Sequence, residues 1–295
     1  MKIAVEHERD VVCIWHDHCT DGMASAWVVH HHFGAGNVEF IGGVYGKPAP
    51  RDDILVDKHV YLVDFSYDAS TLRHIALIAK SVTILDHHKT AELNVQPLLD
   101  EGTIQGAFSS EKSGALLTWC WFFPEQRAPI ILEHVSDRDL WRFDLEDSRE
   151  IEAALSSYPM ELEVWDELMV TSLGVLITQG EAILRSQRQK MKQHLVSAKH
   201  SVELAGYTVP IANCPYAWAS EVGETLCIDK PFSITFVVQA DNVKFSLRSQ
   251  SQSGVDVSEV AKRFGGGGHS GASGFEADFD FLKKLCGTNA ALNSF

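Results

Sequence analysis

Carboxylate and imidazole side chains follow three apolar segments within the first 90 residues. HDHCTDG follows the run at 11–15, Asp64 interrupts the run at 60–65, and Asp86, His87 and His88 follow the run at 82–85. One aspartate at a strand end usually caps a helix or forms a turn. Carboxylates gathered from three segments repel one another and need a cation. Mixed carboxylate and imidazole ligands favour manganese, magnesium, iron or zinc, and two such ions commonly hydrolyse phosphate esters.

The apolar segments predict strands that bring these side chains together. The run at 82–85 has β-branched residues and no charge, which is typical of a strand buried on both faces. Thr20 can cap a helix over 21–33, and Asp68 or Ser70 can cap one that ends near Lys80. Successive strand–helix units imply parallel strands with right-handed crossovers. The aspartates therefore meet at the carboxyl edge of one sheet, where ligands bind in open α/β folds.

The remaining patterns predict a second domain. Residues 89–111 are a looser stretch, 113–122 and 128–135 are helical, and a helical region over 161–199 ends in a polar connecting segment. Two strands then flank Gly206, and a hairpin is predicted at Asp241 and Asn242. A helix over 257–264 precedes GGGGHSGASGF. The predicted fold is α/β, with a mainly parallel, helix-flanked sheet in residues 1–197 and a smaller α/β domain in 198–295.

The composition of the chain argues against several classes of protein. The 295 residues carry a net charge of −15, which disfavours a non-specific grip on duplex DNA but not the binding of a short phosphate-bearing substrate. Six cysteines without a C-x-x-C pair argue against a thiolate zinc site or a disulfide framework. Without an 18-residue apolar run or a secretory signal, we expect a cytoplasmic protein that does not bind membranes.

The motifs together resemble a known superfamily. ILDHHK, preceded by HDHCTDG and LVDFS and followed by GGGGHSGASGF, is similar to the DHH phosphoesterases with a DHH-associated C-terminal domain. Members include RecJ-type exonucleases, nano-RNases, cyclic dinucleotide phosphodiesterases, pAp phosphatases and, more distantly, family II pyrophosphatases. The resemblance spans nearly the whole chain. It implies an active site in the cleft between the domains and two divalent ions, usually manganese, with magnesium or iron as alternatives.

The resemblance also implies roles for individual residues. Asp64 corresponds to the carboxylate that bridges the two ions. The other implied metal ligands are Asp21 with Asp17 or His16, His87, and an aspartate of SDRDLW, for which we prefer Asp137 to Asp139. The implied catalytic residues are His88, which contacts the scissile phosphate or orients the attacking water, and Asp86, which holds an imidazole in place.

One position departs from the family pattern. First motifs in the family commonly have two aspartates one residue apart before the glycine, and Cys19 stands where the inner aspartate is often found. Asp17 and His16 could take over its role, or one metal site could be weaker. A thiolate ligand at Cys19 is the less favoured alternative.

Substrate-binding residues are implied in the second domain. Arg248 matches an arginine that grips substrate phosphate in the family, a role that suits the bidentate guanidinium. In the glycine run, Gly266, Gly267 and Gly268 would let backbone N–H groups approach a phosphate or base, and His269 would add a side-chain donor. The alternative for the glycine run is a flexible loop.

These expectations indicate a manganese-dependent phosphodiesterase that hydrolyses short oligoribonucleotides, linear dinucleotides included, to mononucleotides. Alternatives left open are a pAp phosphatase, a cyclic dinucleotide phosphodiesterase, a RecJ-like single-strand exonuclease, a pyrophosphatase or polyphosphatase, and a nucleotide sensor that does not cleave. The expected partner is short RNA or a dinucleotide rather than duplex DNA. A homodimer is left open.

Overall fold

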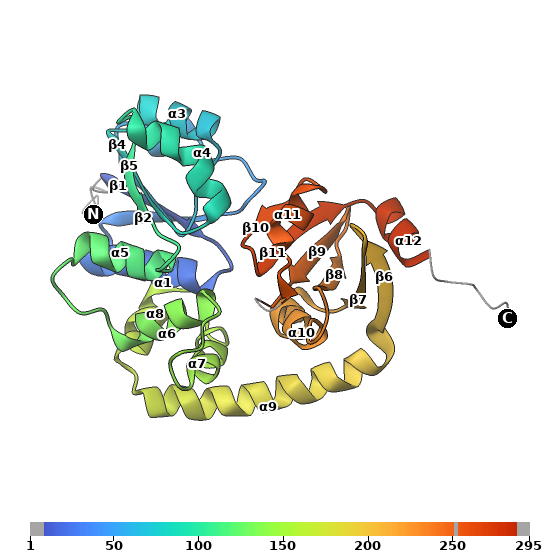
Figure 1. The fold of residues 1–295 in the computed structure, drawn as a ribbon. Coiled ribbons are helices and arrows are strands. Elements are labelled where there is room, and N and C mark those ends of the chain that lie inside the picture. The colour runs from blue at the N-terminus through green and yellow to red at the C-terminus, as the bar shows by residue number, and fades with distance from the viewer. Residues whose placement is uncertain (1–8, 251–252, 288–295) are drawn as a thin grey trace, which may run out of the picture. The chain divides into compact units, whose positions relative to one another are not determined.

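The chain forms two compact units that divide within one long helix. The computed structural model describes residues 9–250 and 253–287, and its units meet at Leu184 and Arg185 (Figure 1). Both of these residues lie in α9 (Leu173–Ala198), as does the predicted boundary near residue 197. Each unit has its own sheet and its own hydrophobic core.

The N-terminal unit contains a parallel five-stranded sheet. Its strands are β1 (Val11–His16), β2 (Val38–Gly43), β3 (His59–Val63), β4 (Ser81–Asp86) and β5 (Gln105–Phe108). Their order is β2-β1-β3-β4-β5, and each neighbouring pair is parallel. The predicted parallel sheet is confirmed, so the carboxyl ends of β1, β3 and β4 lie at one edge.

Helices cover both faces of this sheet. They are α1 (Thr20–Phe33), α2 (Asp52–Leu55), α3 (Ala69–Ile78), α4 (Lys89–Asp100) and α5 (Gly114–Phe122). Alternate residues of β1 point to opposite faces, with Ile14 in a core shared with α3 and α4 and Cys13 in a core shared with α1. Figure 1 shows α3 and α4 on one side of the strands and α1 and α5 on the other.

The stretch 89–111 differs from its prediction because it forms α4 and β5 rather than loose chain. Pro97 lies inside α4, and Gly106 lies inside β5. Proline disfavours a helix interior and glycine weakens a strand interior, so the local sequence favours neither element. Tertiary packing overrides both signals. Val95 and Leu98 of α4 are buried in the core, and a Cβ at position 106 would lie 2.0 Å from the Ile84 carbonyl oxygen.

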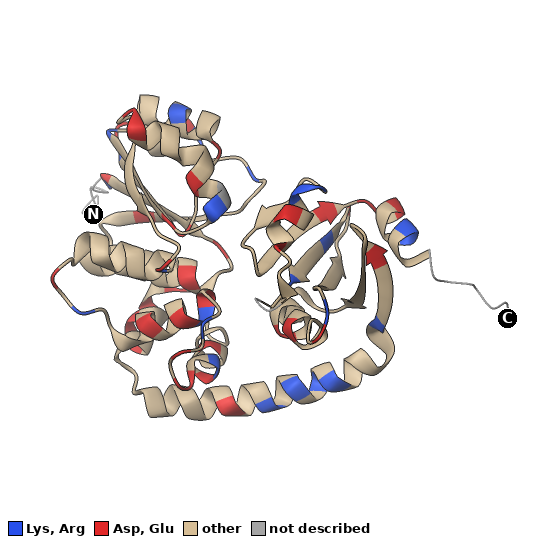
Figure 2. Cartoon of the chain, viewed as in Figure 1, with Lys and Arg blue, Asp and Glu red and all other residues tan. Residues whose placement is uncertain are grey.

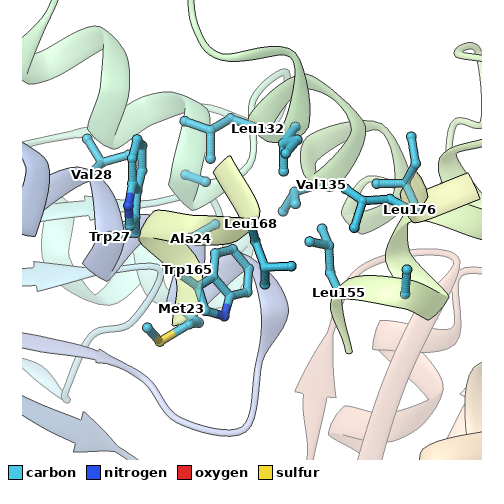
Figure 3. Packing of buried hydrophobic residues seen from close by; sticks show 14 of the residues in the cluster. Met23, Ala24, Trp27, Val28, Leu132, Val135, Leu155, Trp165, Leu168 and Leu176 are labelled. Carbon is cyan, nitrogen blue, oxygen red and sulfur yellow. The ribbon is translucent and has the colours of Figure 1, made fainter. Parts of the chain in front are cut away.

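A second core joins the remaining helices of this unit. These are α6 (Ile130–Asp139), α7 (Ser148–Leu155), α8 (Leu162–Val170) and the first part of α9. Figure 3 shows their apolar side chains around Trp165, together with Met23 and Trp27 of α1. Burial of large apolar side chains is the main stabilising contribution in such a core. This core fixes α6, whose C-terminal end lies at the carboxyl edge of the sheet.

The predicted helical region over 161–199 is interrupted between α8 and α9, where the chain bends by 113°. Within the described residues, no single helix is long and apolar enough to cross a membrane, and only this bent pair reaches the required length and composition together. Its residues Trp165, Leu168 and Leu176 belong to the buried core of the N-terminal unit.

The C-terminal unit contains a mixed six-stranded sheet in the order β10-β11-β9-β8-β7-β6. The strands are β6 (Lys199–Leu204), β7 (Tyr207–Asn213), β8 (Ser233–Val238), β9 (Val243–Arg248), β10 (Gly267–Gly268) and β11 (Ala272–Ala277). Only β7 and β8 pair in parallel among these described strands. The helical segments are η1 (Tyr216–Trp218), α10 (Ala219–Leu226), α11 (Val257–Lys262) and α12 (Phe279–Gly287).

The hairpin between β8 and β9 is shifted by one residue from its prediction. The Gln239 N–H donates to the Asn242 carbonyl oxygen at 2.8 Å, which places Ala240 and Asp241 in the turn. The second half of α9 packs Met191 and Leu195 against α10. The exposed residues Arg185, Arg188, Lys190 and Lys192 make this part of α9 basic, and Figure 2 shows blue segments along the helix.

Candidate metal centre

Asp64 lies at the centre of a buried cluster at the carboxyl edge of the parallel sheet. It directly follows β3, and its side chain is 1% exposed. Its Oδ2 lies 3.3 Å from Nδ1 of His16, and its Oδ1 lies 3.2 Å from Nε2 of His87. His16 ends β1 and His87 follows β4, the two strands that flank β3. The parallel register therefore places one carboxylate between two imidazoles.

The backbone around Asp64 is held in an unusual conformation. Its φ is 54°, in the left-handed region that residues other than glycine rarely adopt. The Asp64 N–H donates to the Leu85 carbonyl oxygen at 2.8 Å, which anchors it to β4. Gly114 at the start of α5 is needed for this packing, because a Cβ there would lie 2.5 Å from the Cβ of Asp64. Sheet and helix thus position this carboxylate together.

Asp21 and Asp139 bring further carboxylates to His87. Nε2 of His87 lies 3.2 Å from Oδ2 of Asp139 and 3.9 Å from Oδ2 of Asp21. Asp21 is in the first turn of α1 and accepts hydrogen bonds from the N–H groups of Gly114, at 2.7 Å, and Ala115, at 3.2 Å. The N-terminus of α5, which carries the positive end of a helix dipole, therefore fixes Asp21. These two amides are not among the predicted site residues, although SGAL at 113–116 is a recognisable helix start in the sequence.

Of the three groups of potential ligands that contain Asp64, one includes Asp86 and His88, and the other two lie on its His16 and His87 sides. The ligand atoms of His16, Cys19 and Asp64 lie within 4.8 Å of one another, and those of Asp21, Asp64 and His87 do the same. Oδ1 of Asp64 and Oδ2 of Asp139 are buried oxygens that accept no hydrogen bond from the described residues. Buried oxygens without donors are costly, and a cation beside them would remove that cost. The donor set therefore fits two divalent ions with Asp64 between them.

The electrostatics of the cluster also indicate a missing positive charge. Burial, followed by the charges of Asp64 and Asp139, raises the pKa of Asp21 well above its ordinary value. Burial likewise acts to raise the pKa of Asp64, but the nearby His16 and His87 outweigh it and hold that pKa far below its usual range. Burial and the same carboxylates raise the pKa of the Cys19 thiol. Divalent ions would stabilise the ionised form of all three groups.

Binding of an ion at His87 is expected to strengthen as pH rises. Burial alone would lower the pKa of His87, but Asp64, Asp139 and Asp21 raise it to about 10. In the metal-free protein, protonated His87 therefore stabilises the fold through these carboxylates. This stabilisation is complete below about pH 6.5, the ordinary histidine pKa, and is lost as pH rises through about 10. An ion must displace the proton, so we expect manganese affinity to increase by up to about tenfold per pH unit in this window.

Titration calorimetry from about pH 6.5 to pH 8, within this window, measures the slope. The His87→Gln variant should have a shallower slope, because a glutamine carries no competing proton. A wild-type affinity that does not change with pH would contradict the assignment.

Asp86 contacts the ring of His88, the imidazole that the family resemblance assigns to it. Its Oδ1 accepts from the backbone N–H groups of His87, at 2.7 Å, and His88, at 3.2 Å, and lies 2.6 Å from Nδ1 of His88. Asp86 is completely buried. Burial opposes its ionisation, but His88 outweighs that effect and lowers the pKa of Asp86. The contact of His88 with substrate phosphate stays a prediction.

The preference for Asp137 over Asp139 is corrected by the structure. The Asp137 carboxylate accepts from the N–H groups of Asp144, at 2.9 Å, and Leu145, at 3.1 Å, and from the Ser148 hydroxyl at 2.6 Å. It therefore holds the loop between α6 and α7. Asp139, at the end of α6, is the aspartate of this motif that reaches His87.

Asp17 is placed differently from His16. Its Oδ1 accepts from the His18 N–H at 2.8 Å, and its side chain lies against Gly42 of β2, where a Cβ would come within 2.8 Å of Asp17 Cγ. Among the described residues, the ion-binding groups contain His16 and Cys19 and not Asp17. Of the proposed substitutes for the missing inner aspartate, His16 is therefore the one that lies beside Asp64.

The predicted substrate residues of the C-terminal unit are ordered within that unit. Nη2 of Arg248 donates to Oγ of Ser220 and Nη1 to the Leu247 carbonyl oxygen, both at 2.8 Å. The side chain of Arg248 packs against Gly223 of α10, because a Cβ added at Gly223 would lie 2.6 Å from Cγ of Arg248. These contacts position the guanidinium at the start of α10. Phosphate binding by Arg248, and its meeting with the metal centre in an interdomain cleft, stay predictions.

The glycine run belongs to the sheet rather than to a flexible loop. Gly267 and Gly268 form β10 and pair with Gly274 and Ser273 of β11. A Cβ at Gly266 would lie 2.0 Å from the Gly274 carbonyl oxygen, so a side chain there would separate the two segments. The His269 N–H donates to the Ala272 carbonyl oxygen at 2.7 Å and closes the turn. Contacts of these residues with substrate stay predictions.

Comparison with known proteins agrees with this architecture. Residues 221–286 match the DHHA1 domain family. The chain is 28% identical over 284 residues to an uncharacterized protein of Acanthamoeba polyphaga mimivirus, covering 89% of this chain and 66% of that protein. It is 26% identical over 215 residues to the oligoribonuclease NrnB of Bacillus subtilis strain 168, covering 65% of this chain and 52% of NrnB. The chain thus spans between half and two thirds of the length of these curated relatives.

Solved structures show the same fold. The DHH domain of a protein assigned to a family of ribosomal proteins superposes with a TM-score of 0.62 at 14% identity, over 95% of this chain and 85% of that one. RecJ from Thermus thermophilus in complex with Mn²⁺ superposes with a TM-score of 0.54 at 14% identity, over 96% of this chain and 52% of RecJ. Residues 221–286 thus form a DHHA1 domain, and with the fold of a DHH domain and the DHH motif itself at residues 86–88 the chain is similar to proteins of the DHH superfamily.

Proposed function

We propose that this protein is a metal-dependent phosphodiesterase that hydrolyses short oligoribonucleotides, linear dinucleotides included, to mononucleotides. The observation that carries the proposal is the pair of ligand groups that share the buried Asp64. Two adjacent divalent ions are suited to displacement at a phosphate ester. The similarity to a protein named oligoribonuclease supports the substrate class.

Manganese is the ion we propose for catalysis. Carboxylate ligands suit magnesium and manganese, and imidazole ligands suit iron and zinc, so a mixed set is compatible with manganese. The structurally similar RecJ was solved in complex with Mn²⁺, which supports the same choice. Asp21, Asp64, His87 and Asp139 would hold the manganese ion, and the group of His16 and Asp64 would hold a second divalent ion.

The residues of the cluster would divide the work of hydrolysis. When bound, the ions would activate a water and share the negative charge that develops on the phosphate. Asp64 would fix the spacing between the two ion positions, because it belongs to both groups. Asp86 holds Nδ1 of His88, so a phosphate contact of this ring would be made through Nε2. The N-terminus of α5 keeps Asp21 in position while charge moves nearby.

A short substrate is favoured by the charge of the chain. Forty acidic residues outnumber 25 Lys and Arg residues, whereas a tight grip on long nucleic acid needs many cationic contacts to phosphates. A dinucleotide requires few such contacts. Arg248 and the hairpin of the glycine run are the proposed contacts in the DHHA1 domain.

A substrate panel tests the proposal. The purified chain with manganese is incubated with a linear diribonucleotide, a short RNA, pAp, a cyclic dinucleotide, single-stranded DNA and polyphosphate, and the products are resolved chromatographically. We expect mononucleotides from the first two substrates at the highest rates, and no products from the His87→Ala variant. Fastest turnover of pAp, of the cyclic dinucleotide, of long DNA or of polyphosphate would replace the proposed activity by the corresponding alternative.

A further inference from the structure

The ligand group on the His16 side contains a sulfur atom. Cys19 is the residue immediately before α1, in an extended conformation with φ −124° and ψ 130°. Its Sγ lies within 4.8 Å of the ligand atoms of both His16 and Asp64. The thiol is therefore one of three donors that surround the same point.

Packing holds Cys19 in this position. A Cβ at Gly22 would lie 2.2 Å from the His16 carbonyl oxygen, so the first turn of α1 sits directly against the end of β1. Asp21 is fixed by the amides of α5. The loop from His16 to Thr20 is thus held at both ends, and the direction of the sulfur follows from that geometry.

The surroundings favour a metal ligand over a reactive nucleophile. The sulfur lies near the carboxylates of Asp64, Asp139 and Asp21, so a cation between them would be held by both kinds of donor. On this side of the cluster the Asp64 carboxylate presents Oδ2, 3.3 Å from Nδ1 of His16, whereas its Oδ1 faces His87.

We propose that Cys19 binds as a thiolate to the ion that His16 and Asp64 hold, and that this position therefore prefers a thiophilic divalent metal such as zinc, iron(II) or cobalt(II). The thiol proton passes to solvent when the sulfur binds the ion. The second position has only oxygen and nitrogen donors, from Asp21, Asp64, His87 and Asp139, and suits manganese or magnesium. This inference rests on the proposed function only for the presence of the metal centre. It means that the two ion positions differ in their donor atoms and in the metal that each prefers.

Cobalt loading tests the inference without any measurement of activity. The metal-free protein, with residues 1–295, is titrated with Co²⁺, and the near-ultraviolet thiolate-to-cobalt charge-transfer band is recorded. We expect the band in the wild type, its loss in Cys19→Ser, and its retention in Cys120→Ser. Cys120 is a matched control because it is an exposed cysteine on α5 outside both ligand groups. Circular dichroism confirms that each variant is folded.

Competition between metals provides a second measurement. The wild type and Cys19→Asp are each loaded from an equimolar mixture of Zn²⁺ and Mn²⁺, and bound metal is quantified. We expect the wild type to retain zinc at one position and the aspartate variant to shift toward manganese by at least about tenfold, the usual scale on which a change around a metal alters its affinity.

The outcomes separate this inference from the proposed function. A charge-transfer band without hydrolysis of dinucleotides would support the thiolate ligand and contradict the proposed activity. Hydrolysis with two bound cobalt ions and no band would contradict the thiolate ligand and leave the activity standing. A band that persists in Cys19→Ser, a metal preference that Cys19→Asp leaves unchanged, or a wild type that binds no cobalt would each overturn the inference.

Discussion

The Asp64→Asn substitution is expected to prevent stable binding at both ion positions and to reduce dinucleotide hydrolysis by at least about 10³-fold, the upper end of the cost of removing one preorganised electrostatic group. Asp64 belongs to both ligand groups and lies between His16 and His87. Asparagine keeps the shape of the side chain but removes its negative charge. Neither ion would then have its shared carboxylate.

Two measurements check this expectation, namely bound metal after equilibrium dialysis and the single-turnover rate on a linear dinucleotide. Asp68→Asn is the matched control, because this exposed aspartate caps α3 through Ser70 and Thr71, and asparagine caps a helix equally well. The control should retain metal content, rate and melting temperature. Two equivalents of bound manganese in Asp64→Asn would show that Asp64 does not bridge the ions.

Asp139→Asn and Asp137→Asn are expected to have opposite effects, although the two positions are two residues apart. Asp139 lies 3.2 Å from His87, so its neutralisation should weaken one ion position and reduce the rate by at least about 10²-fold. The fold should tolerate the change, because Oδ2 of Asp139 accepts no hydrogen bond from the described residues.

Asp137→Asn should instead lower the free energy of unfolding by about 1–3 kcal/mol, because an amide NH₂ would face a donor where a carboxylate oxygen now accepts. That carboxylate binds the N–H groups of Asp144 and Leu145 and the hydroxyl of Ser148. Its activity at a temperature well below the melting transition should stay near that of the wild type.

Urea unfolding of the metal-free proteins and kinetics with saturating manganese distinguish the two variants. The expected result is a slow but stable Asp139→Asn and an active but destabilised Asp137→Asn. The reverse pattern would restore Asp137 as the metal ligand of this motif.

Several features of the fold follow from local sequence patterns. The apolar runs that became β1, β3 and β4 are short, rich in β-branched residues and separated by capped helices, as at Asp68 of α3. Right-handed crossovers between such strands leave little choice but a parallel sheet. Asp64 and His87 are therefore brought to one edge by chain topology, before any detail of side-chain packing is known.

Other elements depended on packing between distant segments. Pro97 and Gly106 argue locally against α4 and β5, yet Val95 and Leu98 gain enough burial in the sheet core to keep α4 helical. Short strands of this kind form because a neighbouring strand is already present. For β5 that neighbour is β4, whose Ile84 pairs with Gly106. The local sequence around Gly106 does not predict this pairing.

The sequence by itself predicted the parallel sheet and the meeting of Asp64 and His87 at one of its edges, because motif spacing and strand order are properties of the chain. Only the tertiary structure decided between Asp137 and Asp139, and it placed Cys19 rather than Asp17 beside His16. Residues two apart on a helix point about 200° away from each other. Which of them faces the cluster depends on how α6 docks against the core, and that contact is made by residues far away in the sequence.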